Sequence, residues 1–379
     1  MMKILRKIHL WISVPFGIII TLICFSGAML VFEHEITRTV QHDIYYVAEV
    51  RDNPQPVGEL MKKVAATLPD TVSITGVTVF HDPARTYQVN LSTGRNASLF
   101  IDQYTGRITG RYERIGFFAK MFRLHRYLLD NANPRGKGIK AGKWAVGIST
   151  LVFVAALITG IVIWCPRVSK AGLRRSLSVS FSKGWTSFLK GLHVAGGMYV
   201  VVFILVMALT GLTWSYQWYR TAFYTLFGAG EAPRIVRHTM LPTDRKDRED
   251  GVNTSDNSEF ELWQQIYDEL AAENPGSPKI TVGHGIAIVF LNDFGNGRAT
   301  DRYKFDRNSG ELKVTSAYSD AEKSIRLRGW VYSTHIGSVG GVITRVIWFI
   351  SALLGATLPL TGYYIWIRHL IRKRHFPKV

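Results

Sequence analysis

The sequence predicts a membrane α-helical bundle of four transmembrane helices in two pseudo-symmetric halves, with an α+β domain on the outer side in each half. Three observations predict this fold: four long stretches without charged residues, a one-sided distribution of Lys and Arg, and an internal repeat. The chain has 379 residues, of which 47% are hydrophobic. Apolar stretches mixed with polar ones fit this composition better than a single soluble core does.

Each apolar stretch is long enough to cross a bilayer. The stretches have 22 or more residues, and at about 1.5 Å of rise per residue they cover a hydrocarbon core roughly 30 Å thick. They are Leu10 to Phe32, Trp144 to Cys165, Gly191 to Tyr219 and Val346 to Ile367. A cleaved signal peptide is the alternative for the first stretch, but its length and the bulky residues that follow it favour an uncleaved anchor.

Basic residues predict the orientation. The segments 1–9, 166–190 and 368–379 carry three, six and five Lys or Arg and no Asp or Glu. Short cytoplasmic segments collect such residues, so we expect both termini in the cytoplasm of a bacterium and the large loops in the periplasm, across the inner membrane. The formal net charge of +18 is then mainly a topology signal, and it gives little reason to expect a nucleic-acid partner.

Two cysteines limit the chemistry of the chain. Cys24 and Cys165 both fall within predicted spans, which excludes a disulfide framework for the outer loops. The sequence also has no Cys-x-x-Cys-His motif, so any haem would be held without thioether bonds.

An internal repeat relates the two halves. Aligning His9 with His193 places Ser26-Gly27 opposite Thr210-Gly211, and Ile158 to Trp164 resembles Leu360 to Trp366. The halves therefore follow the same order of helix, outer domain and helix.

The outer domains repeat as well. The first has a helical pattern at Val57 to Leu68 and an alternating strand at Tyr87 to Leu91. The second has a helical pattern at Phe260 to Ala272 and strands at Ala287 to Leu291 and Tyr303 to Phe305. Both contain Asp-x-x-Ser/Thr-Gly, in which Asp can bond its own backbone and Gly can take the positive φ of a turn.

These features divide the chain into eight segments. They are the cytoplasmic N-terminus with the first span (1–33), outer domain 1 (34–120), an outer His segment with the second span (121–165), a basic cytoplasmic loop (166–190), the third span (191–219), outer domain 2 (220–325), an outer His segment with the fourth span (326–367) and a basic cytoplasmic tail (368–379).

The order of these motifs resembles the PepSY-associated transmembrane family, including siderophore reductases of the FoxB type. The resemblance rests on the two Asp-x-x-Ser/Thr-Gly domains, Leu124-His125-Arg126, Gly191-Leu192-His193 and Thr334-His335 in their places between the spans. It covers nearly the whole chain, and the specificity lies in the order, because each motif is short. It implies two periplasmic PepSY-like domains and a haem-bearing inner-membrane reductase that releases iron from periplasmic ferric siderophores.

Four histidines occupy matching membrane boundaries, and we predict that they are haem iron ligands. His9 and His193 begin the first and third spans on the inner side, whereas His125 and His335 precede the second and fourth spans on the outer side. A pseudo-twofold axis along the membrane normal would pair His9 with His193 and His125 with His335. Two neutral imidazoles saturate a haem iron for electron transfer, so the sequence predicts two non-covalent b-type haems. A hydrogen-bonded boundary histidine is the plainer interpretation of any single one.

Neighbouring residues have two interpretations each. Arg6 and Lys190 lie one helical turn before His9 and His193 and could bind haem propionates, although cytoplasmic anchoring predicts the same residues. Arg123 and Arg126 could serve an outer haem in the same way. The glycines of the repeat could make room for a macrocycle or for close helix packing; they are Gly27, Gly160, Gly211 and Gly362.

Other histidines leave alternatives open. His34 or His42 could replace an outer ligand, and His369 could replace an inner one. Surface positions are the expected interpretation of the remaining four, which are His81, His238, His284 and His375.

The four boundary histidines, together with what the family resemblance implies, lead us to expect a di-haem reductase of ferric siderophores. No nucleotide-binding motif and no long cytoplasmic segment can build a NAD or flavin site, so electrons would come from a membrane quinol or a separate reductase. Two alternatives stay open. One is a PepSY membrane regulator or sensor of a periplasmic protease or ligand, and the other is a ferric-siderophore permease.

Overall fold

The structure is a computed structural model that describes residues 2–93, 97–130, 141–165, 172–173, 176–230 and 258–375. It consists of two compact units. A helical unit contains Met1–Glu33, Ile115–Gly230 and Val331–Val379, and a sheet unit contains His34–Arg114 and Glu231–Trp330. These bounds differ from the predicted segments, because residues 115–120 and 220–230, which we had expected in the outer domains, group with the helices, and residues 326–330, which we had expected with the fourth span, group with the sheet. Part of the predicted basic loop 166–190 and residues 231–257 of outer domain 2 lie outside the described residues.

The helical unit is built from long apolar helices and shorter flanking ones. Its elements are α1 (Met2–Ser13), α2 (Gly17–Leu30), α6 (Gly116–Tyr127), α7 (Ala141–Trp164), α9 (Trp185–Gly191), the π-helical turn η2 (Leu192–Gly196), α10 (Gly197–Ser215), α11 (Gln217–Leu226) and α14 (Gly341–His375), and α13 (Lys323–Ile336) ends within it. Within the described residues, three helical segments are long and apolar enough to cross a membrane: Ala141–Trp164, Trp185–Ser215 and Gly341–Arg372. The bent pair α1 and α2 makes a fourth if it is counted as one span.

The first predicted span is bent rather than straight. The axes of α1 and α2 differ by 67°, and the break contains Pro15, which lacks a backbone N–H and clashes with the preceding turn. The Tyr363 hydroxyl donates a hydrogen bond to the Val14 carbonyl oxygen at the break. The third span has Tyr199 at the position that the repeat aligns with Pro15, and α10 is continuous there.

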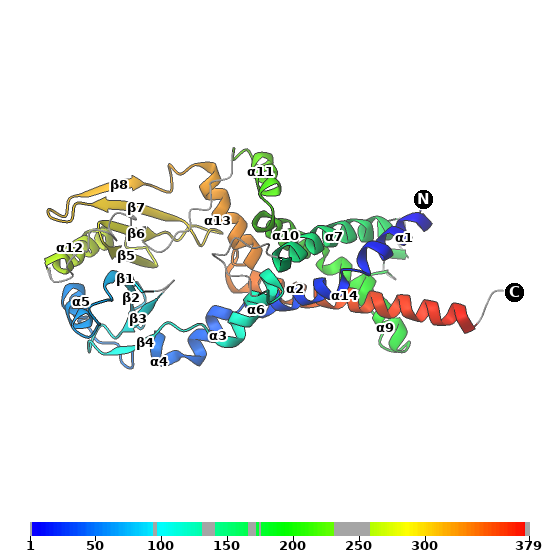
Figure 1. The fold of residues 1–379 in the computed structure, drawn as a ribbon, viewed down its shortest axis with the longest axis horizontal. Coiled ribbons are helices and arrows are strands. Elements are labelled where there is room, and N and C mark those ends of the chain that lie inside the picture. Colours follow the sequence, from blue (N-terminus) through cyan, green and yellow to red (C-terminus); the bar gives the residue numbers. More distant parts are fainter. Residues whose placement is uncertain are drawn as a thin grey trace. The chain divides into compact units, whose positions relative to one another are not determined.

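Apolar side chains both join the long helices and cover their outer surfaces. The buried cluster between them contains Ile20 of α2, Phe153 and Leu157 of α7, Val200 and Ile204 of α10, and Leu358 of α14. Large apolar residues of the same helices are exposed, including Ile18 (63%), Ile158 (49%) and Val202 (63%). An apolar surface around an apolar core is what a lipid bilayer selects. The start of α1 and the end of α14 lie at the same end of this unit (Figure 1), which we call the terminal end.

The two predicted outer domains each contribute one half of a single antiparallel sheet of eight strands. The strand order is β4-β3-β2-β1-β5-β6-β7-β8. The first half contains α3 (Glu33–Val40), α4 (His42–Tyr45), α5 (Val57–Ala65), β1 (Ile74–Phe80), β2 (Tyr87–Leu91), β3 (Ser98–Ile101) and β4 (Ile108–Arg111). The second contains α12 (Ser258–Glu273), β5 (Lys279–Gly283), β6 (Ile286–Phe290), β7 (Thr300–Phe305) and β8 (Leu312–Ser316).

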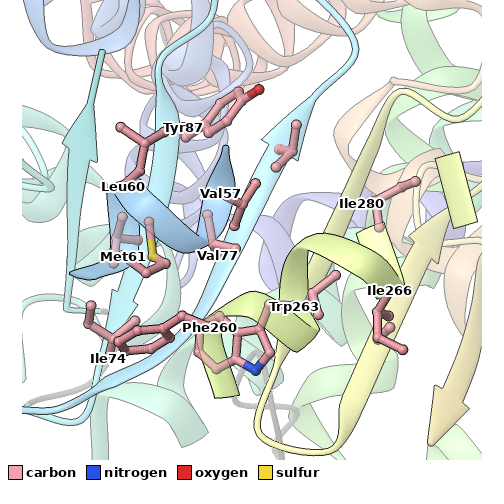
Figure 2. Packing of buried hydrophobic residues seen from close by; sticks show 14 of the residues in the cluster. Val57, Leu60, Met61, Ile74, Val77, Tyr87, Phe260, Trp263, Ile266 and Ile280 are labelled. Atoms are coloured by element: carbon pink, nitrogen blue, oxygen red, sulfur yellow. The ribbon is translucent and has the colours of Figure 1, made fainter. Parts of the chain in front are cut away.

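The halves join where β1 pairs with β5. Val77 lies opposite Val282 and Phe80 opposite Lys279, and the hydroxyls of Thr78 and Thr281 lie 2.8 Å apart across this seam. The helices α5 and α12 cover one face of the sheet, where one hydrophobic core runs across both halves (Figure 2). Its central residues are fully buried and include Leu60, Val77 and Trp263. The alternation of apolar residues along the strands explains why this face is covered.

The repeated Asp-Gly motifs form the expected turns. The Asp102 carboxylate accepts hydrogen bonds from the backbone N–H groups of Tyr104 and Thr105, at 2.8 and 3.3 Å. Asp306 caps the equivalent turn, and Gly106 and Gly310 have φ values of +73° and +76°. These motifs are therefore structural.

Candidate functional site

The structure brings the four predicted histidines together as two pairs, and the members of each pair come from different halves. His9 on α1 and His193 on η2 lie at the terminal end with ring centroids 6.4 Å apart and an interplanar angle of 83°. We call them the terminal pair. His125 on α6 and His335 on α13 have ring centroids 6.1 Å apart and an interplanar angle of 51°. We call them the distal pair.

Each imidazole is held by a hydrogen bond at Nδ1. The partners are helix carbonyl oxygens and hydroxyls of the same half: Thr159 Oγ1 for His9 (2.9 Å), the Ile23 carbonyl oxygen for His125 (2.9 Å), the Leu358 carbonyl oxygen and Thr361 Oγ1 for His193 (both 3.0 Å), and the Met207 carbonyl oxygen and Thr210 Oγ1 for His335 (2.9 and 3.1 Å). A hydrogen bond to a carbonyl oxygen places the proton on Nδ1 and leaves Nε2 as the basic nitrogen. Metal-binding histidines are oriented in this way.

The repeated glycines lie against these rings. A Cβ at Gly27 would lie 2.9 Å from His125 Cε1, and one at Gly211 would lie 3.0 Å from His335 Cε1. At Gly160 and Gly362 the corresponding distances to His9 and His193 are 3.6 and 3.4 Å. The absence of a side chain at Gly27 and Gly211 thus makes room for the imidazole itself.

The spacing of each pair fits one haem iron between its two rings. An imidazole nitrogen binds a metal at about 2 Å, and the ring centre lies about 1 Å beyond the nitrogen. Two imidazoles on opposite sides of one iron therefore have ring centres about 6 Å apart, which agrees with the observed 6.1 and 6.4 Å. Within the described residues, no three His, Cys, Asp or Glu side chains are grouped to hold a bare metal ion. A site with only two imidazoles suits a metal whose other ligands come from a cofactor, as in a haem.

The levels of the two pairs along the third span differ by a large part of the thickness of a hydrocarbon core. His193 lies in the helical segment Trp185–Ser215, and the contacts of His335 begin at Met207 on the same segment. Those 14 intervening steps correspond to about 21 Å along the helix axis. Two groups held at these levels would lie near opposite faces of a hydrocarbon core about 30 Å thick.

The terminal pair lines a cavity of about 690 Å³, within the range of roughly 300–1,000 Å³ that is usual for small-molecule and cofactor sites. Its walls are mostly apolar and come from the long helices. Arg6 and Lys190 line it together with His369. The predicted propionate partners are therefore placed at the same cavity as His9 and His193, and so is the predicted substitute ligand His369.

The basic residues beside the distal pair have different surroundings. Arg123 Nη2 donates a hydrogen bond to the Leu129 carbonyl oxygen (3.3 Å). The guanidinium of Arg126 lies 5.7 Å from the ring centre of Phe122 and 5.6 Å from that of Tyr127. Both arginines lie on α6, the helix that carries His125, which agrees with their neighbouring positions in the sequence.

The remaining histidines lie elsewhere. His34 and His42 are residues of the sheet unit, and His42 stacks on Tyr46 with ring centroids 4.7 Å apart. His81 is exposed, whereas His284 Nδ1 lies 3.0 Å from Glu259 Oε1. His238 and the side chain of His375 lie outside the described residues.

Three features of the site were not foreseen. His193 lies in a π-helical turn, a rare element that is frequent at functional sites. The Trp214 ring packs edge-on against the His335 ring, with the ring centroids 5.1 Å apart. Three threonine hydroxyls contact the paired histidines, namely those of Thr159, Thr210 and Thr361. The one sequence signal for these contacts is that each threonine directly precedes a glycine of the repeat.

Comparison with known proteins gives one family. A family model described as the PepSY-associated TM region matches residues 6–369. No curated protein matches the chain.

Proposed function

Because the chain belongs to the PepSY-associated transmembrane family, we propose that it is a di-haem reductase of ferric siderophores, similar to those of the FoxB type. The observation that carries the proposal is the pair of matched histidine sites, each with ring centres about 6 Å apart and every Nδ1 hydrogen-bonded. The protein would lie in the bacterial inner membrane, with the basic terminal end in the cytoplasm and the sheet unit in the periplasm.

The four histidines would hold two b-type haems through Nε2. The hydrogen bonds at Nδ1 fix the tautomer and the ring orientation and raise the basicity of the ligating nitrogen. Arg6 and Lys190 would neutralise the propionates of the group held by the terminal pair, while the apolar walls of that cavity keep water out. When bound, the haems would supply one-electron carriers on the two sides of the bilayer.

The reaction proposed for the distal side is the reduction of chelated iron. Each Fe(III) takes one electron and becomes Fe(II), which hard oxygen ligands hold far less tightly. A quinol would supply two electrons and release two protons, enough for two ferric ions, and a separate cytoplasmic reductase is the other donor class. No general acid or nucleophile of the chain is needed. Its residues orient and insulate the cofactors.

Visible spectroscopy of the detergent-purified protein tests the proposal. We expect sharp α and β bands after dithionite reduction and about two b haems per chain by pyridine haemochrome. His125→Ala and His193→Ala should each lose one haem, whereas His81→Ala, a change at an exposed position of the sheet unit, should keep both. A folded, colourless protein from haem-replete cells would exclude the reductase.

A further inference from the structure

Three cationic side chains gather in the sheet unit, whereas the histidine pairs belong to the helical unit. Arg38 lies on α3, Arg85 precedes β2, and Lys279 begins β5. The Arg85 guanidinium and the Lys279 ammonium both lie over the Phe80 ring, 4.2 and 5.9 Å from its centre, and Arg38 is near enough for its charge to lower the pKa of both groups. We call these three residues the cation cluster.

The cluster has little negative charge to balance it. Among the described residues, no carboxylate forms an ion pair with any of the three. Among the described residues, Asp82 is the one carboxylate whose charge acts on Arg85, and its Oδ1 already accepts a hydrogen bond from the Ala84 backbone N–H (3.0 Å). Gathering like charges away from water is costly unless an opposite charge compensates them.

Burial increases this cost. Arg85 is only 7% exposed, and among the described residues its guanidinium donates one hydrogen bond, from Nε to the Tyr45 carbonyl oxygen (3.2 Å). Burial and the nearby arginines lower the pKa of Lys279 to about 8. Burial and Arg38 also lower the pKa of Arg85.

Aromatic rings hold the cations in place without neutralising them. The Arg85 guanidinium carbon lies 4.2 Å from the ring centre of Phe80. Lys279 Nζ lies 4.0 Å from the ring centre of Phe290 and 5.9 Å from that of Phe80. Cation–π contacts leave the N–H donors of both groups available to acceptors. Lys279 and Arg38 are partly exposed, so an acceptor can reach the cluster from solvent.

We propose that the cation cluster binds an anionic ferric chelate whose catecholate or carboxylate oxygens accept hydrogen bonds from Arg85, Lys279 and Arg38. This inference rests on the proposed function for the identity of the ligand. It adds that the preferred substrate class carries several negative charges, whereas a neutral tris-hydroxamate gains nothing from the cluster. Charge-assisted hydrogen bonds of this kind are about twice as strong as neutral ones.

Gallium(III) chelates test binding without reduction, because Ga(III) has the charge and ligand preference of Fe(III) and no accessible divalent state. The trianionic gallium tris-catecholate and the neutral gallium tris-hydroxamate would be titrated into the full-length protein in phosphatidylcholine nanodiscs by calorimetry. The variants are Arg38→Gln and Lys279→Met, both at partly exposed positions, and Arg85→Met at the buried one. Lys313→Met, which removes an exposed lysine of β8, is the matched control.

We expect the tris-catecholate to bind at least tenfold more tightly than the tris-hydroxamate. Arg38→Gln and Lys279→Met should each weaken it about tenfold, and Lys313→Met should not. Equal affinities for the two chelates, or unchanged binding in both cluster variants, would overturn the inference. Loss of binding when phosphatidylglycerol replaces phosphatidylcholine would also overturn it, by assigning the cluster to lipid headgroups. If the protein contains no haem but binds the tris-catecholate as expected, the proposed reductase function is refuted and the proposed anion site is supported.

Discussion

Replacing Gly27 with Ala should displace the distal histidine His125 and weaken the haem binding that we propose for the distal pair. The new Cβ would lie 2.9 Å from His125 Cε1, whereas carbon atoms pack at about 3.5–4.0 Å. The ring would have to move by roughly 0.5 Å or more, which stretches its 2.9 Å hydrogen bond to the Ile23 carbonyl oxygen. Losing that bond costs about 1 kcal/mol, and disturbing such a partner lowers metal affinity by about 10–100-fold.

The repeat supplies the matched control. A Cβ at Gly160 would meet His9 Cε1 at 3.6 Å, an ordinary contact, so Gly160→Ala should keep the haem that we propose for the terminal pair. Both substitutions raise intrinsic helix propensity by about 1 kcal/mol, so a haem loss confined to Gly27→Ala is not a general weakening of the helices. The assay is haem per chain and the two midpoint potentials in a spectroelectrochemical titration. Wild-type behaviour of Gly27→Ala, or an equal loss in Gly160→Ala, refutes the reasoning.

Three more outcomes follow from contacts on both units. Thr159→Val removes the hydroxyl 2.9 Å from His9 Nδ1 and should lower the affinity of the terminal pair for its proposed haem about tenfold or more; an unchanged haem titration would contradict that role. Burial alone would raise the pKa of Glu259, but His284 and Arg307 lower it to about 2. The ionised carboxylate therefore contributes at most about 3 kcal/mol, fully present above about pH 4.5 and lost as the pH falls toward 2. In thermal unfolding Glu259→Gln should be less stable than wild type at pH 7, and a gap that does not narrow toward pH 2 would count against this ion-pair network. Trp263→Ala removes a fully buried side chain and should lower the free energy of unfolding by about 3–5 kcal/mol, measured by chemical denaturation; a loss below about 1 kcal/mol would show that the core does not depend on it.

Periodicity and composition predicted the elements of the fold better than their assembly. The strand at Tyr87–Leu91 was predicted with its observed bounds, and the helix predicted from Val57 ends at Ala65 instead of Leu68. The pairing of β1 with β5 was not predicted, because alternation shows which face of a strand is buried and not which strand lies beside it. The 67° bend was not predicted either, although Pro15 marks its position, since a proline in an apolar span can be tolerated with a small kink.

The same reasoning applies to the site. Symmetry predicted which histidines would meet, because a twofold axis turns equal sequence positions into equal positions in space. It left open whether the glycines make room for a macrocycle or for helix packing, and it did not show that Gly27 lies against the His125 ring, since that contact depends on the rotamer of the ring. The cation cluster was invisible in the sequence because Arg38, Arg85 and Lys279 come from three distant segments with no common motif.

The seam between β1 and β5 also bears on the origin of the chain. Antiparallel pairing of two equivalent edge strands is the self-complementary contact that a twofold homodimer forms, and each half of the chain supplies one such strand. A half-length ancestor with two spans and one four-stranded sheet would have left that edge open to pairing with any other strand. Dimerisation through the edge closes it and brings one histidine of each pair from each subunit. Gene duplication and fusion would then have made the dimer permanent, and freed the two copies to diverge at positions such as Pro15 and Tyr199.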